Sequence, residues 1–133
     1  EPVTLLVGES AVLQPLGLRV CCECQENFSE IQNTLSTFAV KCDTIGSTTQ
    51  ILFRPRRTHD EMRVSGGRKP LKKLMIDRKI PLNRRSLLPV AADEHGILGV
   101  YGIGVNLDRA AAPGDRAVII RIEELEKEDS LYD

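Results

Sequence analysis

Aromatic residues are scarce in this 133-residue chain, which has no Trp, three Phe and two Tyr. A nucleic-acid surface built from rows of stacked rings is therefore excluded, and any such surface must depend on charge. No apolar run approaches the roughly 18–20 residues that a transmembrane helix needs, so we expect no membrane partner. No signal-peptide pattern opens the chain, and because it begins with Glu1 rather than Met we expect further parts of the protein to exist.

The chain also lacks a disulfide framework, although it has four cysteines, Cys21, Cys22, Cys24 and Cys42. Three of them crowd into one predicted strand, with Cys22 and Cys24 on one face and Cys21 on the other. We interpret them as reduced thiols of a cytoplasmic protein. Zinc binding is the alternative, but Cys-x-Cys with one distant Cys lacks the usual ligand spacing. We expect no metal site.

Hydrophobic patterning predicts strands for most of the chain, and 41% hydrophobic residues suffice for a folded core. Period-2 alternation and short apolar runs predict strands at 3–7, 11–14, 18–24, 37–43, 49–54, 88–92, 97–101 and 117–125. The turn residues 93–96 predict a hairpin between two of these strands. Residues 55–69 are polar and rich in Pro and Gly, which is typical of a functional loop.

One main helix is predicted at about 70–79, with Pro70 at its first position. Leu71, Leu74 and Met75 form its apolar face, and Pro81 stops it. Lys73 and Asp77 are spaced to pair along the helix, and a short helical turn is expected over 82–86. The fold class is therefore α+β, a strand-rich small domain with one main helix.

The domain organisation that we infer has three parts. Residues 1–48 form an N-terminal strand and linker subdomain that leads in from a helical and catalytic part outside this chain. Residues 49–125 form the binding domain, and residues 126–133 are an acidic tail that frays.

The charge is distributed very unevenly, although the net charge is only −1. Twelve basic and three acidic residues lie between Arg54 and Arg85, a net charge of +9, whereas the remainder carries −10. Such asymmetry is typical of a surface that binds phosphates. The alternative is a solvated basic face that pairs with the acidic flanks of the same fold.

Ser65-Gly66-Gly67, followed by Arg68-Lys69 and a predicted helix start, is the best candidate for holding a phosphate. It lacks the spacing of a nucleotide P-loop, so an RNA phosphate contact or an ordinary loop both stay open. Gly99, Gly102 and Gly104 are better explained as turns than as a dinucleotide site. His59-Asp60-Glu61 offers metal-ligand types, but consecutive side chains rarely converge on one ion. No catalytic constellation is predicted.

From about residue 50 to 106 the sequence resembles the C-terminal substrate-recognition domain of bacterial tRNA(Ile)-lysidine synthetases. The resemblance rests on the spacing of several short motifs, which are Phe53-Arg54-Pro55-Arg56-Arg57, Asp60-Glu61-Met62, Arg68-Lys69-Pro70-Leu71-Lys72-Lys73-Leu74-Met75, Ile80-Pro81, Arg85, Leu88-Pro89-Val90 and Tyr101-Gly102-Ile103-Gly104-Val105. The chain departs from the family at His59, where the family usually has Gly, and at Ser86 and Leu87, where it often has Asp and Arg.

The resemblance implies the tRNA-binding domain of an ATP-dependent ligase that converts an anticodon cytidine of tRNA(Ile) to lysidine. This domain would grip the acceptor stem, and its fold would resemble the B3/B4 region of the phenylalanyl-tRNA synthetase β chain. ATP with Mg²⁺ would act in the absent catalytic domain, so this part is expected to need no cofactor of its own. Other expected partners are the N-terminal catalytic domain and a possible second protomer.

The predicted RNA contacts are the basic residues of the central segment, of which about half are expected to touch RNA: Arg54, Arg56, Arg57, Arg63, Arg68, Lys69, Lys72, Lys73, Arg84 and Arg85. Asp60 is expected to brace its loop, and Leu71, Leu74 and Met75 to belong to the core. The alternative function is a docking or intersubunit scaffold domain without independent RNA binding. Basic side chains on one continuous face would favour RNA, and scattered, internally paired ones would favour the scaffold.

Overall fold

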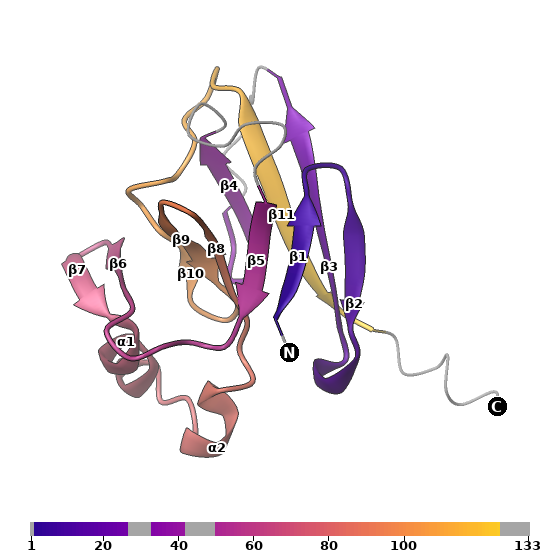
Figure 1. Ribbon diagram of the computed structural model, residues 1–133. Helices are drawn as coiled ribbons and strands as arrows, with labels where there is room; N and C mark the ends of the chain where they lie inside the picture. The colour runs from indigo at the N-terminus through magenta and orange to yellow at the C-terminus, as the bar shows by residue number, and fades with distance from the viewer. Residues whose placement is uncertain (1, 27–32, 42–49, 126–133) are drawn as a thin grey trace, which may run out of the picture.

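Two antiparallel sheets stacked face to face form the body of the protein in the computed structural model, which describes residues 2–26, 33–41 and 50–125 (Figure 1). One sheet has the order β1-β5-β8-β9-β10. Its strands are β1 (Val3–Leu6), β5 (Gln50–Arg54), β8 (Val90–Asp93), β9 (Gly96–Val100) and β10 (Gly104–Val105). The other has the order β2-β3-β11-β4. Its strands are β2 (Ser10–Leu13), β3 (Leu18–Gln25), β11 (Ala117–Glu124) and β4 (Thr37–Lys41), and a 3-10 turn (Gln14–Leu16) joins β2 to β3.

The main core lies between these sheets because the inward residues of both are apolar. Val20 on β3, Ile120 on β11 and Phe38 on β4 are fully buried, and Ile51 and Phe53 come from the facing sheet. The outer face of β11 is covered as well, so that this strand is a nearly continuous apolar run.

The predicted boundary between residues 48 and 49 does not separate two packing units. β1 pairs with β5 from Val3↔Phe53 onward, and β3 pairs with β11 over its whole length. Strands from both sides of the boundary therefore share each sheet, and we correct the prediction of an N-terminal subdomain. The predicted acidic tail, the ends of two predicted strands and Cys42 lie outside the described residues.

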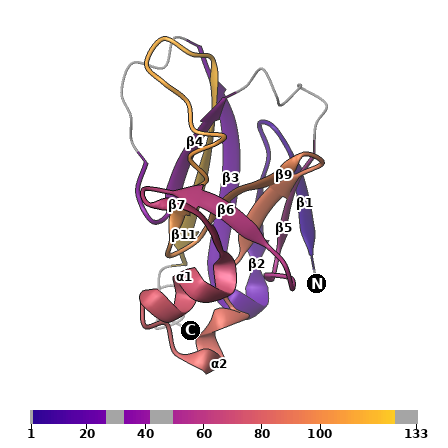
Figure 2. The same cartoon turned by 90° about the vertical axis from the view of Figure 1, so that its left-hand side faces the viewer.

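A smaller lobe projects from one side of the sandwich (Figures 1 and 2). It consists of the hairpin of β6 (Glu61–Val64) and β7 (Gly67–Pro70), followed by α1 (Leu71–Asp77) and α2 (Leu82–Arg85). Met62, Leu71 and Met75 are fully buried in a second cluster against β8 and β9. The apolar face of α1 was predicted correctly, and Pro70 is the residue before the helix rather than its first.

The segment 55–69 was predicted as a loop, but half of it forms the β6–β7 hairpin. Its polar, glycine-containing sequence hid the strands, which are short and half exposed. Ser65-Gly66 is the turn of this hairpin, and Gly67 has φ of +116°. β7, which begins at Gly67, lies between this turn and α1, so the glycines are not at the helix N-terminus as expected. An RNA phosphate contact of these residues stays a prediction.

Candidate nucleic-acid interface

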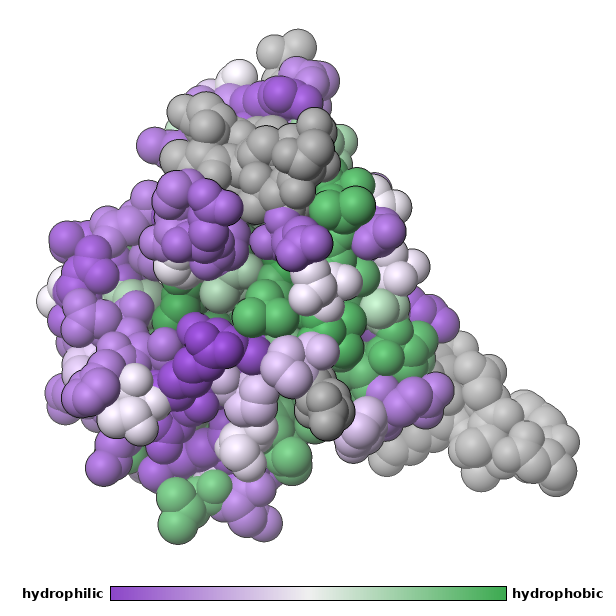
Figure 3. Space-filling model, in the orientation of Figure 1, coloured by the Kyte–Doolittle hydropathy of each residue, from purple (hydrophilic) through white to green (hydrophobic). Residues whose placement is uncertain are grey.

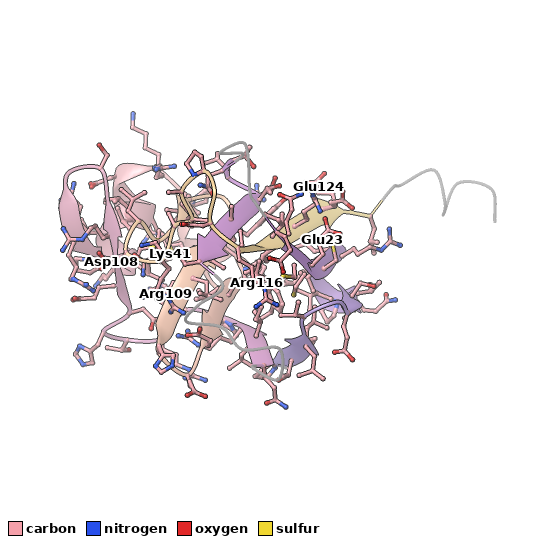
Figure 4. All side chains as sticks on the ribbon, turned by 90° about the horizontal axis from the view of Figure 1, so that it is seen from above. Glu23, Lys41, Asp108, Arg109, Arg116 and Glu124 are labelled. Carbon is pink, nitrogen blue, oxygen red and sulfur yellow. The ribbon has the colours of Figure 1, made fainter. Side chains whose placement is uncertain are left out.

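All ten predicted contact residues lie on the small lobe or on the chain that leads into it, and these elements face the viewer in Figure 2. The space-filling view, in the orientation of Figure 1, shows the left-hand part of the molecule, where the lobe lies, as mainly hydrophilic (Figure 3). The acidic residues Glu23 and Glu124 are on the four-stranded sheet, on β3 and β11 (Figure 4). The basic block of the sequence is therefore also a block in space.

Arg54 does not belong to the exposed set. Its side chain is 7% exposed and makes two hydrogen bonds to Asp60, at 2.9 and 3.2 Å, and one to the carbonyl of Pro55. Asp60 also accepts a 2.6 Å hydrogen bond from the backbone N–H of Arg57. The predicted bracing role of Asp60 is confirmed. Arg54 has a structural partner in Asp60, and its RNA contact stays a prediction.

Arg63 and Arg68 are opposite one another on the β6–β7 hairpin and share one carboxylate. The Nε of Arg63 lies 2.6 Å from Asp108 Oδ1, and a terminal nitrogen of Arg68 lies 2.6 Å from Asp108 Oδ2. Arg68 also lies 3.5 Å from Glu61. Asp108 is in the loop after β10, beside the hairpin (Figure 4). Because two acids oppose two bases here, this cluster adds little net positive charge.

Lys73 and Arg85, two other predicted contacts, have partners within the fold that still leave their charge available to a phosphate. Lys73 and Asp77 lie 3.6 Å apart along α1, as predicted, and both are well exposed. Such an exposed pair contributes little stability and is easily exchanged for a phosphate. Arg85 donates from Nε to the carbonyl of Ile80, which holds α2 against the end of α1.

The unpaired positive charge is concentrated on α1, α2 and the chain before β6. Within the described residues, no ion pair or hydrogen bond involves the side chains of Arg56, Arg57, Lys72, Arg78, Lys79 or Arg84. All but the half-buried Arg56 are exposed, and Lys69 is half-buried as well. Residues 70–86 alone hold six basic residues and one acidic residue, a net charge of +5. Arg78 and Lys79 belong to this exposed set, although they were not among the predicted contacts.

The turn after α1 has an unusual backbone conformation. Lys79 has φ of +57°, and its N–H donates to the carbonyl of Ile76. The N–H of Ile80 donates to the carbonyl of Met75, which completes a Schellman cap with Lys79 where glycine is usual. His59 has φ of +76°, in the left-handed region that glycine adopts most easily.

The three cysteines within the described residues are free thiols that differ in exposure. Cys22 is buried, and burial, with the nearby Cys21 and Glu9, raises the pKa of its thiol to about 12. Cys21 is half-buried, and Cys24 is exposed rather than covered like Cys22. In the part of the chain that the structure describes, no three His, Cys, Asp or Glu side chains are placed to hold a metal ion. In the same part, no helix is long and apolar enough to cross a membrane.

The fold and the charged lobe together define a small β-sandwich domain with an appended basic face suited to a polyanion. Residues 51–123 match the family described as the TilS substrate C-terminal domain, and the chain belongs to that family. It is similar to a solved structure described as the TilS C-terminal domain, with a TM-score of 0.76 and 26% identity over 96% of this chain and 100% of that one.

A curated relative gives the same relationship. Over 58 residues, 42% of this chain, the sequence is 40% identical to the tRNA(Ile)-lysidine synthase of Clostridioides difficile (strain 630). The matched part is 13% of that protein's length. The α+β fold class, strand-rich with one main helix, and the family resemblance are therefore confirmed. The likeness to the phenylalanyl-tRNA synthetase region stays a prediction.

Proposed function

We propose that this chain is the tRNA-gripping domain of a tRNA(Ile)-lysidine synthase and binds the acceptor stem. The observation that carries the proposal is the exposed net charge of +5 over α1, α2 and their connection. Double-stranded RNA presents a deep, narrow major groove, so proteins recognise it mainly through its backbone and shape. Basic side chains on two short helices at one side of a rigid sandwich suit that task.

The revised contact set follows from pairing and exposure. Its members are basic, lie on the lobe or on the chain that leads into it, and have side chains that are unpaired, in an exposed ion pair or bonded to a backbone carbonyl. They are Arg56, Arg57, Lys72, Lys73, Arg78, Lys79, Arg84 and Arg85. Arg63 and Arg68 would contribute less because Asp108 already neutralises part of their charge. Lys69 stays a secondary candidate at the base of the hairpin.

The activity of the parent protein is part of the proposal. A lysidine synthase would use ATP, with Mg²⁺, in a catalytic domain outside this chain to modify the anticodon of tRNA(Ile). The domain described here would hold the far end of the same tRNA, so that only a substrate with the right acceptor stem reaches the catalytic site. A cytoplasmic location and contact with the catalytic domain belong to this proposal, as does a possible homodimer.

Fluorescence anisotropy with a tRNA(Ile) acceptor-stem minihelix, titrated from low to moderate salt, tests the proposal. We expect affinity to fall steeply with salt, as for about 4–6 phosphate contacts. Lys72→Glu or Arg84→Glu should weaken binding strongly. Arg19→Glu is the matched control, because Arg19 is an exposed base on β3 in the other sheet. Absence of binding at low salt by the folded chain would contradict the proposal.

A second candidate function is protein docking, which one groove favours. It lies between the sheets' ends, holds about 320 Å³, and has a largely apolar lining that includes Val12, Leu13, Leu16, Phe53 and Pro89. Apolar lining without a concentration of charge suits a protein surface better than RNA. The test measures binding of this chain to the separately expressed catalytic domain. If Val12→Asp weakened that binding, and the unmodified chain did not bind RNA, docking would replace RNA binding as the proposed function.

A further inference from the structure

A groove runs between the connection of α1 to α2 and the turn after β9. Its lining includes Lys79, Arg84, Leu88, Tyr101 and Gly102, and Leu35 lies at its edge with its side chain exposed. Its volume of about 440 Å³ is within the usual range of small-ligand sites, about 300–1,000 Å³. The N–H of Gly102 donates to the carbonyl of Leu35 at 2.8 Å, which fixes one wall against the other.

The groove contains an aromatic ring, and the described part of the chain has few. Phe38 and Phe53 are buried in the main core, so Tyr101 is the aromatic side chain of this part that reaches the surface. It packs against both core clusters, and its N–H donates to the carbonyl of Pro89. A ring held in this way is a rigid platform for stacking.

Positive charge lies at the rim next to the ring. Lys79 and Arg84 both line the groove and have no ion-pair partner in the described ranges. Arg84 is near enough to the Tyr101 hydroxyl to affect its pKa, although burial and Glu124 act in the other direction and leave that pKa raised. Glu124 is not among the residues that line the groove, and the two charged side chains that line it, Lys79 and Arg84, are both basic.

We propose that this groove holds one unpaired nucleotide at the end of the bound RNA helix, with its base against Tyr101 and its phosphate near Lys79 and Arg84. The inference rests on the proposed function, because the lobe that grips the duplex also forms the groove. An apolar lining with one ring and basic residues at the rim matches the two parts of a nucleotide, a base and a phosphate. An apolar peptide would leave Lys79 and Arg84 without partners.

The test compares a blunt-ended acceptor-stem minihelix with one that carries a four-nucleotide single-stranded 3′ overhang. We expect the overhang to increase affinity about 5- to 10-fold, the effect of one stacked base. A 2-aminopurine placed in the overhang should lose fluorescence on binding. Tyr101→Leu should abolish both effects while leaving the affinity for the blunt RNA unchanged, and Tyr101→Phe should keep both.

A second variant tests the groove independently, in case Tyr101→Leu does not fold. Leu35→Glu changes an exposed side chain at the edge of the groove and should also remove the overhang effect, whereas Thr4→Glu adds the same charge on β1 and should not. Equal affinity for both RNAs would overturn this inference and leave the proposed function standing. Binding of neither RNA at low salt would overturn both.

Discussion

Lys79→Gly should stabilise the protein while weakening its grip on RNA. Lys79 adopts φ of +57° in the cap that ends α1. A side chain costs roughly 1–2 kcal/mol in this left-handed conformation. Glycine removes that cost but loses about 0.5–1 kcal/mol more backbone freedom on folding. We therefore expect the free energy of unfolding to rise by about 0.5–1 kcal/mol, and the Tm by about 2–5 °C.

The matched control is Lys79→Ala, which removes the same charge and keeps the Cβ atom. Its stability should stay near that of the natural protein, because the backbone strain persists. Both variants should bind the minihelix more weakly, and the slope of log affinity against log salt should fall by about 0.7–0.9 if one phosphate contact is lost.

Urea denaturation and thermal unfolding of the three proteins give the stability differences, and the anisotropy titration gives the salt slopes. Equal stabilities of the glycine and alanine variants would refute the strain argument. An unchanged salt slope would remove Lys79 from the RNA contacts without affecting the argument about the cap.

Three further changes test the interior. Asp60→Asn should lower the free energy of unfolding by roughly 2–4 kcal/mol in urea titrations, because the buried Arg54 loses its counter-charge. Gly99→Ala should cost about 1–3 kcal/mol in the same assay, since a Cβ would lie 2.7 Å from the Phe38 ring. In the folded protein burial raises the pKa of Cys22 to about 12, whereas the unfolded chain has the ordinary value of 9.0. The unfolded chain therefore loses this proton first, and the free energy of unfolding should fall as pH rises from about 9 toward 12. The decline should be at most about 1.4 kcal/mol per pH unit, and Cys22→Ala should remove it.

Local patterns predicted what depends on neighbours along the chain. The alternation in β3 and β11, the helix that carries Leu71, Leu74 and Met75, and the turn after Asp93 all agree with the structure. Each is determined within about ten residues, by side-chain periodicity or by turn-forming residues. The β6–β7 hairpin was missed because its strands are short, polar and not buried on both faces.

Long-range pairing could not be read from the sequence. Nothing local indicates that β1 adds to the sheet of β5, or that β3 runs beside β11 near the other end of the chain. Asp108 is likewise about forty residues from the arginines that it neutralises. The same limitation applies to the groove, whose walls come from residues near 35, 80 and 101.

We expect ion pairing, more than the count of basic residues, to determine where this domain binds a polyanion. In the sequence, segments 54–69 and 70–86 carry net charges of +4 and +5, which makes them nearly equal candidates. In the fold, Asp60 forms an ion pair with Arg54, and Asp108 forms ion pairs with both Arg63 and Arg68. A phosphate that displaced those carboxylates would regain little, since each arginine already has an anionic partner. The helices keep their charge exposed, so α1 and α2 are where RNA affinity should be lost first when bases are removed.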